Sequence, residues 1–329
     1  MNLFFILGSP RSGTTLLQAM LNRHPHIAIP PETKLFCDFH LRSLRRRMEC
    51  LRRIGEDLNV RIQADDVGTG LDELLPQIML RFVERGGRSD IRFVGEKTPE
   101  HTSRIPSIRG CFPKSLIIAI VRDGVCVADS LTRVPWLSCD HGSAALIWRY
   151  YMNHISQAVT TDEQSIHVVR YEELVSSPEN VLMTILMKLG ADVSFVEEMI
   201  QPNVNLDGQL FPIRESQWKA NAVQPVFSRD RSGLSITEYQ KRAMEVAFGQ
   251  MLRKWDYPSV ASDIGTIERM QLMAYNYTKS LQTVAKMPVD KWMDELKRLL
   301  SSGLHIRKPQ RLQQSCEEGI VDYCNGPTR

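Results

Sequence analysis

Residues 3–15, Leu-Phe-Phe-Ile-Leu-Gly-Ser-Pro-Arg-Ser-Gly-Thr-Thr, decide the fold. The first five form a short, unbroken apolar run, which is typical of a strand buried on both faces of a sheet. Residues 14–22 then carry leucine and methionine at helical spacing. A strand, a glycine loop and a helix in this order begin a βαβ unit.

Further apolar runs alternate with helical patterns along the chain. Strands are predicted over residues 27–29, 92–95, 115–121 and 165–170. Helices are predicted over residues 14–22, 39–58, 71–84, 125–132, 144–158, 180–189, 236–255 (as one long helix), 267–284 and 289–300. Because strands alternate with helices, we expect an α/β protein with a central parallel sheet. Residues 1–258 are taken as the main domain and residues 259–329 as a helical C-terminal extension of unknown role, an appendage or a dimer contact.

Composition excludes several classes of protein. The 329 residues are 43% hydrophobic and 24% charged, as in ordinary globular proteins. A net charge of +3 is too balanced for a nucleic-acid binder. The seven cysteines form no C-x-x-C pair, so neither a zinc site nor a disulfide framework is expected. No apolar stretch reaches the roughly 18 residues of a transmembrane segment and no signal peptide is apparent, so we expect a cytoplasmic protein.

The glycine loop predicts an anion site. Residues 8–15 precede a helix, so their backbone N–H groups would converge on an anion at its positive end. The spacing of Gly8 and Gly13 resembles a Walker A loop, but Thr14 stands where that motif needs its lysine, which disfavours an ordinary ATPase or GTPase. Arg11, Ser12, Gly13, Thr14 and Thr15 still form a phosphate cradle. The alternative is a tight turn with nothing bound.

Two motifs together resemble a known family. Residues 10–15 resemble the 5′-phosphosulfate-binding loop of sulfotransferases that use 3′-phosphoadenosine 5′-phosphosulfate (PAPS). Residues 118–123, with Ser130 eight residues after Arg122, resemble the segment that binds the 3′-phosphate. The resemblance implies a P-loop NTPase-like three-layer fold, PAPS as co-substrate and its desulfated form PAP as product. The alternative for Arg122 is a surface ion pair, and the alternative for Ser130 is a helix serine bonded to its own backbone.

Two later elements are also similar to the family. Residues 168–174 resemble a strand-ending Tyr-Glu-x-Leu signature, and residues 216–219 resemble a late Ser-x-Trp element. The resemblance implies that Tyr171 and Trp218 line the nucleotide site. A buried tyrosine at the sheet edge and a tryptophan that anchors the core are the alternatives.

The resemblance spans residues 3–257 and is closest to the bacterial and tyrosylprotein branch, because Arg11 replaces the lysine of the cytosolic branch and residues 31–34 resemble a Glu-Thr-Arg element. It implies that Glu32 is the general base, that Lys97 contacts the transferring sulfuryl group and that Ser216 assists at the leaving oxygen. A glutamate at a helix N-terminus and an exposed loop lysine are the alternatives. His101 is the second candidate for the base.

This chain departs from the family pattern in three places. Lys34 replaces the arginine of the Glu-Thr-Arg element, residues 222–233 resemble an insertion, and residues after about 260 match nothing recognised.

The expected reaction is in-line transfer of a sulfuryl group to an acceptor hydroxyl, without a metal. A glycan, a lipid or polyketide alcohol, another small molecule and a peptide tyrosine all remain open as acceptors, as does a homodimer. The alternatives in function are a P-loop nucleotide or small-molecule kinase and a non-catalytic nucleotide-binding scaffold.

Overall fold

A parallel five-stranded sheet forms the centre of the computed structural model, which describes residues 2–38, 44–87, 90–162, 164–201, 210–212, 215–219 and 230–285. Within these ranges the strand order is β2-β3-β1-β4-β5. The strands are β1 (Asn2–Gly8), β2 (Ile27–Ala28), β3 (Phe93–Lys97), β4 (Leu116–Val121) and β5 (Ile166–Arg170). The sequence prediction of an α/β fold with a parallel sheet is confirmed.

Alternation along the strands builds two hydrophobic layers. In β1, Phe4 and Ile6 join the cluster on one face of the sheet, whereas Phe5 and Leu7 join the cluster on the other. All four side chains have no exposed surface. The fold is therefore the P-loop-like, three-layer α/β/α arrangement.

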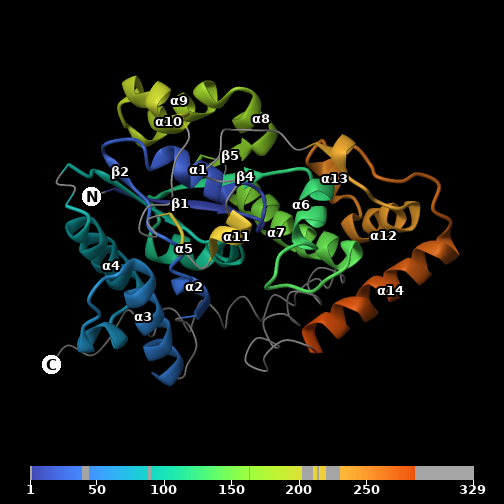
Figure 1. The fold of residues 1–329 in the computed structure, drawn as a ribbon, viewed down its shortest axis with the longest axis horizontal. Coiled ribbons are helices and arrows are strands. Elements are labelled where there is room, and N and C mark those ends of the chain that lie inside the picture. Colours follow the sequence, from blue (N-terminus) through green and yellow to red (C-terminus); the bar gives the residue numbers. More distant parts are fainter. Residues whose placement is uncertain are drawn as a thin grey trace.

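Helices cover both faces. The layer with Phe4 packs against α1 (Thr14–Leu21), α8 (Tyr171–Ser176), α9 (Pro178–Leu189) and α10 (Val196–Met199), which gather on one side in Figure 1. The layer with Phe5 packs against α2 (Leu35–Asp38), α3 (Leu44–Leu58), α4 (Leu71–Arg85), α5 (Ile105–Cys111), α6 (Gly124–Leu131), α7 (His141–Thr161), α12 (Glu238–Phe248) and α13 (Met251–Lys254). The remaining elements are α11 (Ser216–Lys219), α14 (Thr266–Ala285) and the 3₁₀ turns η1 (Ala64–Val67), η2 (Pro99–Arg104), η3 (Val193–Phe195) and η7 (Arg231–Gly233).

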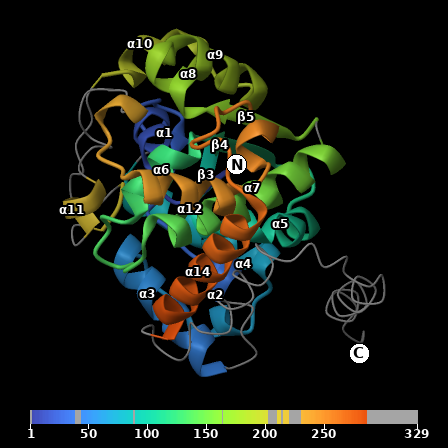
Figure 2. The same ribbon diagram turned by 90° about the vertical axis from the view of Figure 1, so that its right-hand side faces the viewer.

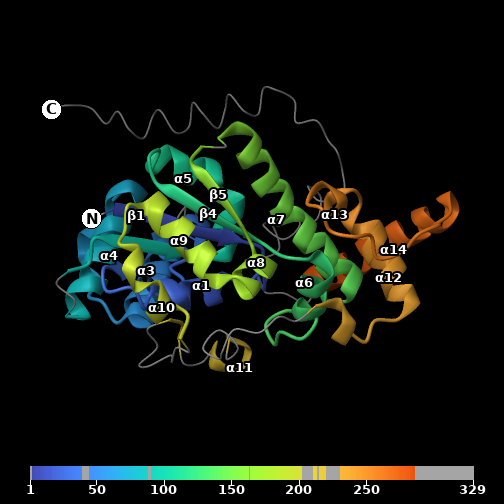
Figure 3. The ribbon, with the colours of Figure 1, turned by 90° about the horizontal axis from the view of Figure 1, so that it is seen from above.

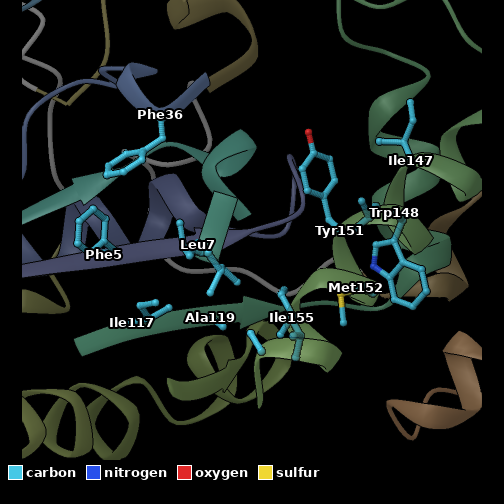
Figure 4. Close-up of a cluster of buried hydrophobic side chains, with 14 of the residues drawn as sticks. Phe5, Leu7, Phe36, Ile117, Ala119, Ile147, Trp148, Tyr151, Met152 and Ile155 are labelled. Carbon is cyan, nitrogen blue, oxygen red and sulfur yellow. The ribbon is translucent and has the colours of Figure 1, made fainter. Parts of the chain in front are cut away.

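The helix α7 connects the sheet to the C-terminal helices. Figure 3 shows it reaching from the sheet toward α12 and α13. Its Trp148, Tyr151 and Met152 belong to the same buried cluster as Phe5 and Leu7 (Figure 4). The indole Nε1 of Trp148 donates a hydrogen bond of 3.1 Å to the carbonyl oxygen of Arg122. The core thereby holds the backbone of Arg122, which directly follows β4.

The single long helix predicted over residues 236–255 is wrong. The chain forms α12 and α13 there, because Gly249 between them adopts φ +58° and ψ −127°, a backbone that a helix cannot continue through. A capping box between Thr237 and Gln240 begins α12 at Glu238. Of the helix predicted over residues 39–58, residues 39–43 lie outside the described part.

The C-terminal extension contains a helix that packs on the main domain. The helix α14 agrees with the pattern over residues 267–284 and lies across α12 in Figure 2. Asn276 donates 2.9 Å to the carbonyl oxygen of Ala243, and Ser280 donates 3.0 Å to Ser143 of α7. The helix predicted over residues 289–300 lies outside the described residues, and the division at residue 258 stays a prediction. The described ranges contain no helix with the length and apolarity needed to span a membrane.

Candidate active site

The predicted site residues gather at one edge of the sheet, because the carboxyl ends of parallel strands share an edge. The glycine loop follows β1, Lys97 ends β3, Arg122 follows β4 and Tyr171 follows β5. Since β1 lies between β3 and β4, Lys97 and Arg122 flank the loop from opposite sides.

Two glycines allow the loop to lie against its neighbours. Gly13 has φ +101°, and a Cβ atom built on it would lie 2.4 Å from Cδ2 of Tyr171. A Cβ on Gly8 would lie 2.6 Å from the carbonyl oxygen of Ile120. Thr102 Oγ1 accepts from the N–H of Gly8 at 2.8 Å and donates to its carbonyl at 3.0 Å. A side chain at Gly8 would therefore force the loop away from β4, and one at Gly13 would force it away from the ring of Tyr171.

The loop has donors available for an anion. The hydroxyl of Ser12 is buried and has no hydrogen-bond partner among the described residues. The helix α1 begins at Thr14 with no side-chain cap on its first N–H groups. A buried hydroxyl without a partner costs about 1–3 kcal/mol unless a ligand satisfies it. These features fit a bound phosphate or sulfate group.

The two strand-to-helix junctions meet in space. Arg122 Nη1 donates to the carbonyl oxygen of Arg11 at 3.2 Å, and Arg11 Nε donates to Ser130 Oγ at 3.0 Å. The guanidinium of Arg122 also stacks 4.0 Å from the ring centre of Tyr171. Burial lowers the pKa of Arg11, and the nearby charges of Arg122 and Arg133 lower it further. Such a concentration of positive charge suits an anionic ligand.

A second network fixes the residue after Arg122. Asp123 caps α6 by accepting from the N–H of Val125 at 2.8 Å, and it pairs with Arg231 at 2.8 Å. Its own N–H donates to Glu172, whose other oxygen accepts from Tyr257 at 2.9 Å. The turn that carries Arg122 is thus held from three sides.

On the other side of the loop, Glu32 lies between two lysines. Its Oε1 accepts from Lys97 Nζ at 2.6 Å and from Lys219 Nζ at 2.7 Å. Lys97 also donates to Thr15 Oγ1 at 3.3 Å and is only 1% exposed, so the alternative of an exposed loop lysine is wrong. Burial acts to raise the pKa of Glu32, but Lys97, Lys219 and Lys34 outweigh it and hold that pKa below its ordinary value. Burial lowers the pKa of Lys97.

One glutamine joins the segment before Glu32 to a residue that precedes α11 in the chain. Gln18 of α1 is fully buried, and its Nε2 donates to the carbonyl oxygens of Pro30 at 2.8 Å and Leu210 at 2.9 Å. It therefore connects Pro30, shortly before Glu32, and Leu210 to the helix after the loop. The short helix α11 carries Ser216, which is half-buried, and Lys219. The side chain of Trp218 lies outside the described part of the structure.

His101 occupies a buried structural position. Its Nδ1 lies 2.7 Å from Glu96 Oε2, and its Nε2 accepts from the N–H of Phe36 at 3.1 Å. Since a backbone donor occupies Nε2, the ring proton sits on Nδ1 and is donated to Glu96. Thr33 and Thr98 donate to the other oxygen of Glu96. His101 therefore has no nitrogen free to accept a proton from an acceptor.

Sequence reasoning missed three contributors to this arrangement, namely Gln18, Glu215 and Lys219. Glu215 Oε2 forms an ion pair of 2.6 Å with Lys219 Nζ. Lys219 lies within the element over residues 216–219, which the sequence analysis interpreted through its serine and tryptophan alone. Gln18 carried no signal, because a polar residue in a helical pattern usually faces solvent.

Comparisons with known proteins agree with the motifs. A family model described as "Sulfotransferase family" matches residues 4–194, more than half of the chain. The chain is 28% identical over 200 residues to protein-tyrosine sulfotransferase 2 of Gallus gallus, a match that covers 58% of this chain and 51% of that protein. It is 23% identical over 310 residues to nodulation protein NoeE of Sinorhizobium fredii, covering 85% of this chain and 72% of that protein. The chain thus spans about half the length of the chicken relative.

Among solved structures, the sulfotransferase domain from the Synechococcus PCC 7002 olefin synthase superposes with a TM-score of 0.49 at 23% identity. That match covers 78% of this chain and 95% of the solved chain.

Proposed function

Since the chain belongs to the sulfotransferase family, we propose that it transfers a sulfuryl group from PAPS to an acceptor hydroxyl, with Glu32 as the general base. The observation that carries this proposal is the contact between Arg122 and Arg11, because it brings together the two motifs that resemble phosphate-binding segments of the family. Two anion sites side by side suit a nucleotide with phosphate at both its 3′ and 5′ positions.

The donor would be held by groups from both junctions. The hydroxyl of Ser12 and the N–H groups at the start of α1 would bind the 5′ end. Arg122 and Ser130 would bind the 3′-phosphate, and the ring of Tyr171 would keep the guanidinium of Arg122 in place. When bound, PAPS supplies an activated sulfuryl group, which passes in line to the acceptor oxygen.

The catalytic roles follow from the position of each side chain beside the loop. Lys97 already reaches Thr15, so its ammonium can turn to the charge that develops on the leaving phosphate. Glu32 lies beside Lys97 and would take the proton of the acceptor hydroxyl. Ser216, on the same short helix as Lys219, would donate to the leaving oxygen.

We propose the phenolic hydroxyl of a peptide tyrosine as the acceptor. The chicken relative is named a protein-tyrosine sulfotransferase, and Glu32 lies in the element that resembles that branch. A phenol with pKa near 10 also needs less help from a base than an alkyl alcohol does. The chain spans only about half the length of that relative, so the relative's acceptor is not assumed for this chain. Glycan and lipid alcohols are therefore assayed beside the tyrosine peptide.

The test combines binding with turnover. Calorimetry should show PAP binding without Mg²⁺ and no comparable binding of ATP. Radiolabelled PAPS should then transfer its label to a tyrosine peptide, and the same peptide with phenylalanine in place of tyrosine is the matched control.

Three results would overturn parts of the proposal. Phosphate transfer from Mg·ATP without any response to PAPS would identify a kinase instead. PAP binding without transfer to peptide, glycan or lipid alcohol would leave a nucleotide-binding scaffold. Label on glycan or lipid alcohols but not on the peptide would overturn the tyrosine acceptor alone.

A further inference from the structure

We propose that Lys219, with Glu215 as its counter-ion, is a positioning residue that holds Glu32 in place as the base once Lys97 turns to the sulfuryl donor. This inference rests on the proposed function, because it assigns a task to a residue beside the proposed base.

The geometry places two cations from different elements on one carboxylate oxygen. Glu32 Oε1 accepts from Lys97 at the end of β3 and from Lys219 on α11, at 2.6 and 2.7 Å. The exposed side-chain fractions are 0% for Lys97, 12% for Glu32 and 10% for Lys219. Water therefore contributes little to stabilising the carboxylate, and the lysines largely replace it.

The two lysines differ in their other partners. Lys97 shares its ammonium with Thr15 of the glycine loop at 3.3 Å, so a negative group bound there would draw Lys97 away from Glu32. Lys219 instead pairs with Glu215, four residues earlier in the chain, at 2.6 Å. Among the described residues, Lys219 makes no hydrogen bond to the loop. A negatively charged donor bound in the loop would therefore attract Lys219 less than Lys97, so Lys219 stays on the carboxylate.

This division of roles answers a chemical difficulty. A carboxylate that keeps both lysines is ionised but is a poor proton acceptor, because each cation stabilises its charged form. Departure of Lys97 raises the proton affinity of Glu32 at the moment when the donor is bound. Lys219 then keeps the carboxylate oriented, and Glu215 limits how strongly the remaining charge of Lys219 lowers the proton affinity of Glu32.

Several charged groups act on this carboxylate and set the direction of each effect. Those that act on it directly are Lys97 of β3, Lys219 of α11 and Lys34 of its own segment. Glu215 acts on Lys219 and also on Lys97 and Lys34, while Glu100 of η2 and Arg53 of α3 act on Lys34. Removing the charge of Lys219 takes a cation from Glu32, whereas removing the charge of Glu215 leaves that cation uncompensated. The two changes should move the proton affinity of Glu32 in opposite directions.

The experiment measures kcat for the full chain with PAPS and the tyrosine peptide as a function of pH. The acid limb of kcat reports the ionisation of the base in the bound complex. Lys219→Met should move that limb to higher pH by about 1 to 3 units, the range for loss of an adjacent opposite charge. Glu215→Gln should move it to lower pH, and Lys219→Arg should restore it to near its original position. PAP affinity should change less than threefold in all three variants.

A matched control is Lys241→Met, which removes a lysine from the exposed i,i+3 pair with Glu238 on α12 and should leave the limb in place. The inference fails if the limb stays in place in both Lys219→Met and Glu215→Gln, or if it moves in the same direction in both.

A second measurement keeps the inference testable where a variant folds poorly or turns over slowly. Infrared spectra are recorded for the PAP complexes of the wild type and of Glu32→Gln. The difference between the two spectra isolates the carboxyl band of Glu32, so its protonation can be followed with pH and without any acceptor. Its titration should move upward in Lys219→Met but not in Lys219→Arg,Glu215→Gln, which keeps the cation beside Glu32. Equal titrations in the two variants would overturn the inference. Full turnover by Glu32→Gln would instead refute Glu32 as the base, which separates failure of the proposed function from failure of this inference.

Discussion

Arg122 donates a hydrogen bond from its guanidinium to the main-chain carbonyl oxygen of Arg11, 111 positions earlier in the chain, at 3.2 Å. This contact joins the junction after β4 to the junction after β1. Arg11 lies in the loop after β1 and Arg122 directly follows β4, so each junction can contribute to one end of the same ligand. The contact is therefore the structural basis for expecting a doubly phosphorylated ligand.

Arg122→Ala should weaken PAP binding by about 1 to 3 kcal/mol, because it removes a charge-assisted hydrogen bond to the 3′-phosphate. Titration calorimetry measures this. The matched control is Arg52→Ala, which changes an arginine on the exposed face of α3 and should leave PAP affinity as it is. Equal affinities in wild type and Arg122→Ala would refute the 3′-phosphate assignment.

Gly13→Ala should destabilise the protein more than a change of backbone angle alone explains. Gly13 and Gly190 both have positive φ, but only at Gly13 would a Cβ meet another atom, Cδ2 of Tyr171 at 2.4 Å. Gly190→Ala should lower the free energy of unfolding by about 1 to 2 kcal/mol, the cost of the left-handed conformation. Urea titration of both variants isolates the additional cost of the contact. Equal losses of stability would show that the loop can move away from Tyr171 at little cost.

Glu32→Gln should spare PAP binding and reduce turnover by roughly 10² to 10⁴, the usual contribution of a general base. The amide keeps the shape of the side chain but cannot take the proton of the acceptor. Calorimetry and transfer of label from PAPS measure the two effects on the same preparation. A variant that retains wild-type turnover would move the base to another residue.

His101→Asn should lower the thermal midpoint while leaving kcat within a few-fold of wild type in the folded protein. The ring of His101 connects Glu96 to the N–H of Phe36, and loss of such a buried partner costs about 1 to 3 kcal/mol. A catalytic base at this position would instead give a large loss of kcat with little change in stability. Calorimetric unfolding and turnover together distinguish the two roles.

The ion pair between Asp66 and Arg81 should make stability depend on pH. Burial acts to raise the pKa of Asp66, but hydrogen bonds from Arg81 and from the N–H of Gln63 hold it below its ordinary value. The folded state therefore favours the ionised form, so its contribution is present above about pH 4 and is lost as pH falls through the lowered pKa. Asp66→Asn should reduce the free energy of unfolding at pH 7 and reduce it less at pH 3.

Urea titrations at the two pH values measure this difference. Glu84→Gln, at an exposed position near the end of the helix that carries Arg81, is the control and should show no such trend. A destabilisation by Asp66→Asn that is equal at both pH values would argue against a lowered pKa.

Local pattern predicted most of the framework because each strand is a continuous apolar run between turn residues. The run over residues 115–121 predicted β4 and therefore the position of Arg122. The long helix over residues 236–255 was predicted wrongly, since apolar spacing continues through Gly249 although its backbone angles do not. Periodicity reports which side chains face the core, not whether the backbone between them stays helical.

The sequence by itself determined the βαβ order, the glycine loop and the identity of the groups at the strand ends, because these depend on neighbours a few residues apart. Only the tertiary structure decided that Lys219 reaches Glu32, 187 positions earlier. It likewise decided that His101 is held between Glu96 and Phe36 with no nitrogen free. Such pairings depend on which segments pack together, and a buried glutamine in α1 ties two of those segments to one helix. Long-range packing is a property of the whole folded chain, so no short window of residues encodes it.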